Sequence, residues 1–522
     1  MKCVTSEKMR ELDRRTIEEF GTPGEVLMDR AGLCVAETVQ RWVTDRGADP
    51  SSIQLLAGRG NNGGDAFTAA WHLADRGFRV EVLLAGTVDA VAGDARTHLQ
   101  RVLDVGIRVY EWPTEEAWQQ GRATVPPAPV LVDGLLGTGT QGPVRGAIAG
   151  AIDYMQSAAH AWVVAIDVPS GLDPDTGATE GPAVRADVTV TMGLPKRGLL
   201  APAAVEYVGA IEVADIGFPA EFVDQLEGEP DCQFLHATDV RSLLPKRRRS
   251  AHKGSCGHVL LIGGSLDYSG AIILAARAAM RTGSGLVTVL VPESIADRVA
   301  IACPEVMVRP ARETEIGSLS AENWNEWRSF MSRFSAILVG PGMTQHNDSL
   351  VLVRVLIREA PAPLVVDADA LQVLGQQAHW LERASVPTVI TPHPGEFARL
   401  MGKQVEEVQA NRIPLASEAA QSTGATVVLK GAQSVIASAG QPSAVNSTGN
   451  PGMATGGSGD VLAGMVVSLM GQGLAAYDAA RLATWLHGRA GDRIARRTSE
   501  YSLIASDLID ELPVAFKDLE TL

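Results

Sequence analysis

A glycine-rich segment near the C-terminus constrains this chain more than any other. Residues 450–464 read NPGMATGGSGDVLAG, and an apolar run with helical spacing, Val461 to Met470, begins inside them. This pattern predicts a loop that leads into a helix N-terminus, where free backbone N–H groups and the positive end of the helix dipole favour a phosphate. Asp460 stands where the loop should become helix. Its carboxylate could cap the helix or accept a proton from a substrate hydroxyl, and a plain glycine-rich connector is the simpler alternative.

Length and composition predict a globular protein with two domains. The chain has 522 residues, which is too long for one ordinary hydrophobic core. Its net charge of −16 argues against a nucleic-acid-binding surface. The five cysteines show no CxxC spacing, so we expect reduced core thiols. The charged start MKCVTSEKMRELDRR lacks the apolar region of a signal peptide, and no apolar run is long enough for a membrane span. We therefore expect a cytoplasmic protein without membrane or nucleic-acid partners.

Three predicted strands in the N-terminal half each end in a polar loop that contains glycine. The strands are residues 53–57, 130–133 and 162–166, and the loops are residues 58–65, 134–142 and 167–173. Because ligands bind at the carboxyl edge of a parallel sheet, these loops should converge on one site. The first loop is neither GxGxxG nor a P-loop, but Asn61, Asn62 and Asp65 offer groups for a ligand or a cation. An ordinary βα turn would explain that loop alone equally well. The convergence of three loops favours an active site.

The strand-and-helix pattern restarts in the second half, after a predicted boundary at residues 228–231. We expect an N-terminal domain of residues 1–225, a linker of residues 226–234 and a C-terminal domain of residues 235–522. The basic run Lys246–Arg249 is interpreted as a solvated segment or as the counter-charge of a nearby nucleotide. Predicted strands of this half end in further polar loops, at residues 263–265, 340–342, 367–369, 392–396, 430–434 and 456–460. The two halves are separate α/β units rather than copies.

Seven motifs occur along the chain in a fixed order: Asn61–Asp65, Asp133–Gly139, Ile166–Leu172, Gly340–Gly342, Thr391–Glu396, Val428–Gly431 and Gly456–Asp460. Each is modest alone, and their combination is specific. In this order they resemble the bifunctional NAD(P)H-hydrate repair enzymes, in which an epimerase is fused to an ADP-dependent dehydratase, over nearly the whole chain. One departure is Ala66, where the family usually carries glycine, and a helix start tolerates alanine well.

The resemblance implies a Rossmann-like N-terminal domain that interconverts the R and S hydrates of NADH and NADPH at C6. Asp167 would contact the substrate as acid or base, and Asn62, Asp133 and Ser170 would bind K⁺. Oxygen ligands suit K⁺, and a C6 epimerisation needs a carboxylate near the stereocentre. The implied contacts to the hydrated nucleotide, besides Asp167, are Asn61, Asn62, Gly63, Gly64, Asp65, Gly137, Thr138, Gly139, Thr140, Gln141, Gly142 and Pro143.

For the C-terminal half the resemblance implies a ribokinase-like domain. There ADP, accompanied by Mg²⁺, would phosphorylate the hydroxyl of the S hydrate, and loss of phosphate would restore NAD(P)H. Asp460 would be the base. A lone His393 would more often be structural, but its place within the Pro392–Glu396 motif favours binding. The implied hydrate contacts are Ala271, Gly342, His393 and Asp460, and the implied nucleotide contacts are Lys430, Gly431, Ala432, Gln433, Ser434 and Gly459. We also expect a homo-oligomer that acts on small molecules.

Two other functions are compatible with parts of the pattern. A vitamin or sugar kinase shares the glycine loop and the aspartate, but such kinases usually carry Asn-x-x-Glu where this chain has His393–Glu396. The N-terminal domain could also be a binding module without activity. Asp167 and the three intact loops argue against that alternative.

Overall fold

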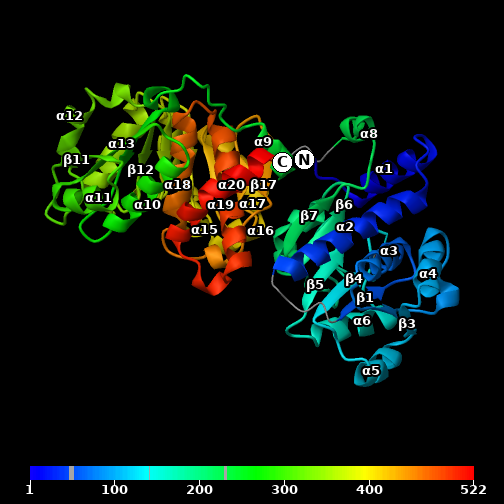
Figure 1. The fold of residues 1–522 in the computed structure, drawn as a ribbon. Helices are drawn as coiled ribbons and strands as arrows, with labels where there is room; N and C mark the ends of the chain where they lie inside the picture. Colours follow the sequence, from blue (N-terminus) through cyan, green and yellow to red (C-terminus); the bar gives the residue numbers. More distant parts are fainter. Residues whose placement is uncertain (46–51, 140–141, 228–231, 522) are drawn as a thin grey trace. The chain divides into compact units, whose positions relative to one another are not determined.

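The computed structural model describes residues 1–45, 52–139, 142–227 and 232–521, and the chain divides into two compact units (Figure 1). One unit is Lys2–Pro230, and the other is Asp231–Leu522 together with Met1. Both units place helices around a mainly parallel sheet, so the predicted α/β fold class is confirmed. The division falls inside the predicted linker.

In the described part of Lys2–Pro230, seven parallel strands form one sheet in the order β3-β2-β1-β4-β5-β6-β7. The central strands are buried along their whole length, which explains their continuous apolar sequences. Strands β2 and β3 follow β1 on one side of it, and the strands from β4 onwards lie on its other side. The strands are β1 (Ile53–Ala57), β2 (Val80–Leu84), β3 (Arg108–Glu111), β4 (Val130–Gly134), β5 (Trp162–Ile166), β6 (Val188–Met192) and β7 (Ala210–Ala214). Ligands of open α/β sheets bind at such a switch point, here beyond the ends of β1 and β4.

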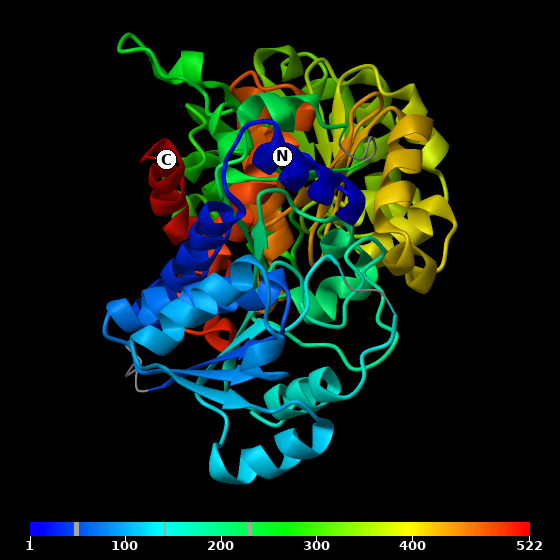
Figure 2. The same cartoon turned by 90° about the vertical axis from the view of Figure 1, so that its right-hand side faces the viewer.

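Helices cover both faces of this first sheet. Figure 2 shows the blue helices α2–α4 on one face and the cyan helices α5 and α6 on the other. The first layer buries Phe67, and the second buries Trp118 and Tyr154. The helices are α1 (Ser6–Glu18), α2 (Gly24–Asp45), α3 (Asn61–Asp75), α4 (Asp94–Asp104), α5 (Glu115–Thr124), α6 (Ala147–Gln156), α7 (Val205–Val208) and α8 (Ala220–Gln225).

In the described part of the second unit, ten strands form one sheet in the order β11-β10-β9-β12-β13-β14-β15-β16-β17-β8. Pairing is parallel except on both sides of β16. Here too the strand order reverses: β10 and β11 lie on one side of β9, and β12 begins the other side. The strands are β8 (Cys232–Leu235), β9 (His258–Ile262), β10 (Leu286–Pro292), β11 (Met307–Ala311), β12 (Ala336–Val339), β13 (Leu364–Val366), β14 (Thr388–Ile390), β15 (Thr426–Leu429), β16 (Val435–Ala437) and β17 (Ser443–Asn446).

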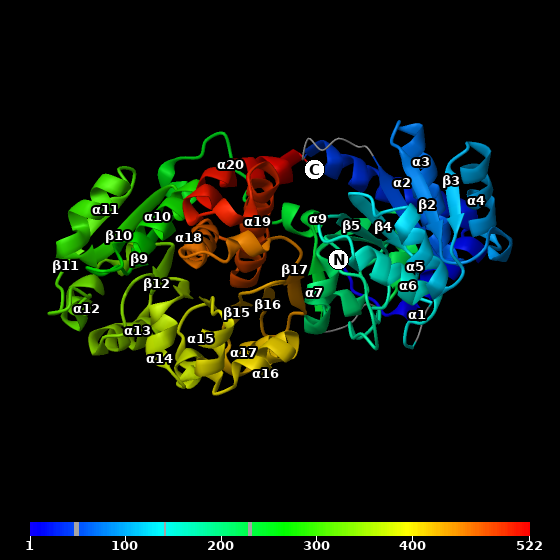
Figure 3. The ribbon, with the colours of Figure 1, turned by 90° about the horizontal axis from the view of Figure 1, so that it is seen from below.

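The second sheet also lies between two helix layers. Figure 3 shows α13–α17 on one face and α10 with α18–α20 on the other. Helix α18 is apolar nearly all round and almost entirely buried, as its sequence predicts. No described helix combines the length and the apolar character that a membrane crossing requires. The helices are α9 (Ala237–Arg241), α10 (Ser269–Arg281), α11 (Ala296–Ala302), α12 (Trp324–Trp327), α13 (Asn347–Glu359), α14 (Asp369–Leu374), α15 (Pro394–Met401), α16 (Val405–Ala410), α17 (Arg412–Thr423), α18 (Ser458–Gly471), α19 (Ala476–Arg497) and α20 (Ala505–Thr521).

The basic run lies at the end of the second unit that is remote from its glycine loop. Arg247 donates a 2.6 Å hydrogen bond to the carbonyl of Gly283, just after α10 ends. A side chain on Gly283 would meet both Arg247 and Gln472, the residue that follows α18. Asp460 lies near the opposite end of that helix, whose 14 residues span about 20 Å. Lys246–Arg249 are exposed and lie away from the predicted nucleotide loop, which favours the interpretation of a solvated segment over that of a nucleotide's counter-charge.

Candidate active sites

A cavity of about 830 Å³ opens at the switch point of the first unit. The backbones after β1 and β4 meet there: Gly58 N–H donates to the carbonyl of Gly134 at 2.9 Å, and a side chain on Gly58 would clash with Leu135. The structure brings seven of the predicted hydrate contacts to the cavity wall: Asn61, Asn62, Asp65, Gly137, Thr138, Gly139 and Asp167. The cavity lining does not include Gly63, Gly64, Gly142 or Pro143. Thr140 and Gln141 lie outside the described residues.

The three predicted K⁺ ligands lie together and are linked by hydrogen bonds: Asn62 lines the cavity, and Asp133 and Ser170 lie behind its wall. Ser170 donates from N and from Oγ to Asp133, at 2.8 and 2.6 Å. Leu136 N–H donates to Ser170 Oγ at 2.9 Å, and the amide N–H of Asn62 donates to the Leu136 carbonyl at 2.7 Å. Asn62 Oδ1 accepts no hydrogen bond from the described residues.

The chemistry of this group suits a monovalent cation. Asp133 is fully buried and has no basic side chain as an ion-pair partner among the described residues. Burial raises the pKa of Asp133 to about 6, although hydrogen bonds from Ser170 and Leu135 lower it. The described residues contain no group of three or more His, Cys, Asp and Glu arranged for a metal ion. One carboxylate with neutral oxygens fits K⁺ better than a transition metal.

Asp167, the predicted acid or base, is bound tightly through one oxygen. Its backbone has a φ of +66°, and its Oδ1 accepts hydrogen bonds from the Met192 N–H at 3.1 Å and from the ammonium of Lys196. Lys196 also donates to Thr191 Oγ1 at 3.2 Å and to the Met192 carbonyl at 3.0 Å. This lysine was not among the predicted site residues. A lysine four residues after the end of β6 was the available signal.

A second carboxyl group in the cavity comes from α1. Met9, Asp13 and Ile17 all line the cavity, at i, i+4 and i+8 of the helix. Burial raises the pKa of Asp13 to about 6, with Lys196 lowering it and Asp167 raising it. Burial, together with Asp167 and Asp13, also raises the pKa of Asp65 well above its ordinary value. Sequence analysis missed Asp13, although an acidic residue inside the apolar stripe of an amphipathic helix was a visible signal.

In the second unit, the glycine loop leads into α18 earlier than predicted. The helix begins at Ser458 after Gly457, which has a φ of +89°, so Asp460 is its third residue and not its cap. The capping interpretation of Asp460 is therefore wrong. Ser458 and Val461 donate to carbonyls of the loop, but no such bond is made by the N–H groups of Gly459 and Asp460 within the described chain. These free donors at a helix N-terminus suit an anion.

Lys430 lies between this N-terminus and a group of carboxylates. Its Nζ is 3.1 Å from Asp367 Oδ1 and 3.9 Å from Glu396 Oε2. A Cβ added to Gly459 would lie 3.2 Å from the same nitrogen. Burial lowers the pKa of Lys430, but Asp367 and Glu396 raise it more, so it lies above its ordinary value. Lys430 is therefore a fixed positive charge beside the free N–H groups.

Two carboxyl groups near Lys430 titrate close to neutrality. Burial, and then the negative charge of Asp367, raises the pKa of Asp460 to about 7, while the positive charge of Lys430 lowers it. Burial likewise raises the pKa of Glu396 to about 7, again opposed by Lys430. A general base with a pKa near the working pH combines basicity with a useful ionised fraction. Asp460 has this property and lies beside the free N–H groups.

His393 caps helix α15, and this fixes its tautomer. Its Nδ1 accepts from the N–H groups of Gly395 and Glu396 at 3.0 and 3.3 Å, while Glu396 accepts from the His393 N–H at 2.8 Å. Burial, and then Lys430, lowers the pKa of His393. The ring is therefore neutral with its proton on Nε2, so it can donate a hydrogen bond to a ligand but cannot take a proton there.

The predicted hydrate contacts Ala271 and Gly342 lie against each other where β9 and β12 end. Gly342 has a φ of +63°, and a Cβ added there would lie 3.2 Å from that of Ala271. The loops are joined directly, because Gly264 N–H donates to the Pro341 carbonyl at 2.7 Å. This is the switch point of the second sheet, equivalent to the cavity position in the first.

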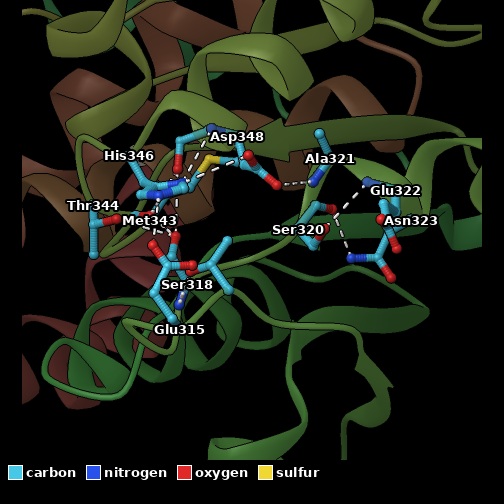
Figure 4. Close-up of polar contacts among 12 residues, drawn as sticks. Glu315, Ser318, Ser320, Ala321, Glu322, Asn323, Met343, Thr344, His346 and Asp348 are labelled. Atoms are coloured by element: carbon cyan, nitrogen blue, oxygen red, sulfur yellow. Dashed lines mark hydrogen bonds and ion pairs between the residues drawn. The ribbon is translucent and has the colours of Figure 1, made fainter.

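A polar cluster that the sequence did not reveal supports the loop of Gly342 (Figure 4). Ser318, which is fully buried, donates to the Met343 carbonyl at 2.7 Å and accepts from Thr344 Oγ1 at 3.0 Å. Ala321 N–H donates to Asp348 at 2.8 Å. Thr344 N–H also donates to Asp369 at 3.0 Å. The cluster therefore ties residues 318–321 to the loop that carries Gly342.

The predicted nucleotide segment Lys430–Ser434 forms a tight turn after β15. Arg412 holds it by donating to the carbonyls of Leu429 and Lys430 at 2.9 and 3.1 Å. Gly431 has a φ of +145°, and Ser434 Oγ donates to its carbonyl at 3.0 Å. Burial lowers the pKa of Arg412 to about 10. This arginine, which was not among the predicted residues, holds the start of the turn by its hydrogen bonds to the two carbonyls.

The fold and the two sites define a two-unit α/β enzyme, Rossmann-like in one half and ribokinase-like in the other. Family models described as "YjeF-related protein N-terminus" and "NAD(P)H-hydrate dehydratase" match residues 24–198 and 259–514. The bifunctional NAD(P)H-hydrate repair enzyme of Moorella thermoacetica is 40% identical over 520 residues, which cover 100% of this chain and 97% of the relative. That of Thermofilum pendens is 36% identical, with 99% and 97% covered. The chain belongs to the family of bifunctional NAD(P)H-hydrate repair enzymes, as predicted.

A solved structure resembles the second unit. It is the ADP/ATP-dependent NAD(P)H-hydrate dehydratase from Bacillus subtilis, co-crystallised with ATP/Mg²⁺. It is 32% identical, covers 55% of this chain and 98% of its own, and has a TM-score of 0.49.

Proposed function

We propose that each unit carries one of the two repair reactions. The Lys2–Pro230 unit epimerises the R and S hydrates of NADH and NADPH at C6, in the cavity of Asp167. The Asp231–Leu522 unit dehydrates the S hydrate with ADP, at the N-terminus of α18. The observation that carries the second assignment is Asp460, whose carboxyl has a pKa of about 7 beside free N–H groups and the ammonium of Lys430.

In the dehydratase site, the residues around α18 would bind the transferred phosphoryl group. The Gly459 N–H and Lys430 offset its negative charge, and electrostatic stabilisation of this kind supplies most of the catalysis in phosphoryl transfer. Asp460 takes the proton of the C6 hydroxyl as the oxygen attacks the β-phosphorus of ADP, which releases AMP. Phosphate then leaves C6 and a proton leaves C5, which restores the double bond of NAD(P)H.

The other predicted residues have supporting positions in this proposal. The Lys430–Ser434 turn holds the nucleotide, while Ala271, Gly342 and His393 contact the hydrate. His393 donates from Nε2, since its tautomer is fixed. Mg²⁺ usually binds through one or two carboxylates together with substrate phosphates and water, so Asp367 and Asp369 would suit an ion that enters with the nucleotide. That ion would supply charge neutralisation on the phosphates.

In the epimerase site, the cavity holds the hydrated nicotinamide near Asp167. Asn62, Asp133 and Ser170 would hold K⁺ behind the loop of residues 137–139, and the ion would supply a positive charge near an anionic ligand. Oδ2 of Asp167 accepts no hydrogen bond from the described residues and is free to take a substrate proton.

The test uses the full chain with pure S hydrate, ADP and Mg²⁺. We expect NADH and AMP to form in equal amounts, and Asp460→Asn to slow this by roughly two to four orders of magnitude, the span usual for a lost general base. The variant should still show the melting shift that Mg-ADP gives the parent. A parental rate in this variant would contradict the assignment.

A further inference from the structure

We propose that Asp13 is the second proton-transfer residue of the epimerase cavity and works as the partner of Asp167. The inference rests on the proposed epimerase function and extends it to a residue of α1. It starts from the position of the carboxyl group: Asp13, Asp65 and Asp167 line the same cavity, and Lys196 is the ammonium among them.

The N-terminal segment places Asp13 in the cavity through backbone bonds. Val4 pairs with the segment of Lys196: its N–H donates to Pro195 at 3.0 Å, and its carbonyl accepts from Arg197 at 2.9 Å. Two residues later, Ser6 donates to Asp175 through N and Oγ, at 2.6 and 2.7 Å. Helix α1 therefore starts from a fixed point beside Lys196. Its third turn brings Asp13 to the cavity wall.

Lys196 is unsuited to the second proton transfer. An ammonium has three protons to donate, and this one makes three hydrogen bonds, to Asp167, Thr191 Oγ1 and the Met192 carbonyl. Its side chain is fully buried. Lys196 therefore keeps Asp167 in place as a positioning residue, and the proton that balances the reaction must come from another group.

Asp13 has the properties that Lys196 lacks. In the described chain its carboxyl makes no hydrogen bond or ion pair, so its proton is free to move. The charged groups that face it are Lys196, Asp167 and Asp65, and the remaining charged residues of the cavity wall are Arg10, Arg59, Asp94 and Arg145. Its pKa, which burial raises to about 6, keeps a protonated fraction available at neutral pH, whereas Asp167 is hydrogen-bonded to the ammonium of Lys196.

The reaction needs one acid and one base. In the hydrate, C6 carries both the hydroxyl and the ring nitrogen N1. Asp167 takes the hydroxyl proton, the C6–N1 bond breaks, and Asp13 gives its proton to N1, which yields an open-chain aldehyde. After rotation about C5–C6, N1 attacks the other face of the carbonyl carbon, returns its proton to Asp13, and the oxygen recovers its proton from Asp167. No other reactant is consumed, and both carboxyl groups return to their starting states.

The experiment follows the conversion of pure R hydrate to S hydrate by chromatography, in the full chain without ADP. We expect Asp13→Asn to lower kcat by about 10²–10⁴-fold, the range of a lost general acid. Its KM should change by less than about threefold, and its dehydration of S hydrate should stay parental. Asp13→Glu, which keeps a carboxyl group, should retain more activity than Asp13→Asn. Glu11→Gln removes an exposed carboxylate from the same helix and should behave as the parent.

The pH profile separates a proton donor from a structural residue. In the parent, kcat/KM should fall as the pH rises through about 6, because only protonated Asp13 is the acid, and Asp13→Asn should lose this limb. A parental rate in Asp13→Asn, a loss confined to KM, or an unchanged pH profile would overturn the proposal. A parent that does not epimerise the hydrate at all would overturn the proposed function itself.

Discussion

The ammonium of Lys430 lies 3.1 Å from a carboxylate oxygen of Asp367, and this ion pair joins the ends of β15 and β13. Thr391 Oγ1, just after β14, donates to the same oxygen at 2.6 Å. The three strands are neighbours in the sheet. Polar groups from three consecutive strand ends therefore fix one positive charge beside the N-terminus of α18.

Lys430→Met should weaken nucleotide binding and also destabilise the second unit. The methionine side chain keeps the volume but leaves the buried carboxylates Asp367 and Glu396 without their cation, and breaking a buried pair costs about 3–5 kcal/mol. We expect the Kd of Mg-ADP, measured by calorimetry, to rise at least tenfold. Lys403→Met removes a partly exposed lysine that forms an ion pair with Glu407, away from the proposed site, and should bind as the parent. Equal affinity in both variants would show that Lys430 is purely structural.

Asp460→Asn should change how stability depends on pH. The pKa of Asp460 is raised from 3.8 to about 7, so between these values the native state binds more protons than the unfolded state. The stabilisation is full below about pH 4 and is lost as the pH rises through about 7. Asparagine is neutral throughout. Melting curves should therefore coincide near pH 4, and the variant should melt above the parent at pH 8. The opposite order would contradict the direction of the shift.

Asp133→Ala should lower epimerisation and leave dehydration of pure S hydrate intact. The substitution removes the single carboxylate among the proposed K⁺ ligands, together with its bonds to Ser170. Adding K⁺ should raise the melting temperature of the parent and have no such effect on the variant. An equal loss of both activities would show that the two units are not independent or that the ion site is elsewhere.

Ser318→Ala should raise the KM for the hydrate more than it raises the Kd of Mg-ADP. Ser318 binds the Met343 carbonyl and Thr344, so its removal loosens the loop of Gly342, although Ser349 Oγ still donates to that carbonyl at 3.1 Å. We expect a loss of stability of about 0.5–1.5 kcal/mol and a KM increase of several-fold. Ser329→Ala, at an exposed position on a surface turn, is the matched control. A parental KM would show that the cluster does not position the hydrate.

The strands that bear the sites were predictable from sequence because parallel strands buried on both faces have continuous apolar runs. β1 and β5 have the predicted bounds. Strands β7, β8, β11, β16 and β17 were not predicted; they lie at or near sheet edges, are short, or, like β11, contain proline. Helices α3 and α18 begin three to five residues earlier than predicted, at Asn61 and Ser458, because a glycine-rich first turn carries no apolar periodicity.

The motif residues of the sites were also predictable, whereas their partners were not. Asp167 and Asp460 stand in glycine-bearing loops that the pattern identifies. Lys196 and Asp13 lie near Asp167, and Arg412 holds the turn after β15, but each comes from an element far away in sequence. Local pattern can mark such a residue as unusual, and it does not say which loop the residue contacts. Ser318 is bound to a loop 25 residues away, and only the three-dimensional packing reveals it.

One complementation assay tests the central claim, that the two units hold separate active sites. The assay starts from pure R hydrate with ADP and Mg²⁺ and measures NADH by its absorbance. Asp460→Asn should produce S hydrate without NADH, and Asp167→Asn should convert the R hydrate no faster than it epimerises without enzyme. An equimolar mixture of the two variants should form NADH at a substantial fraction of the parental rate, because each supplies the site that the other lacks. A mixture as inactive as either variant alone would contradict the account.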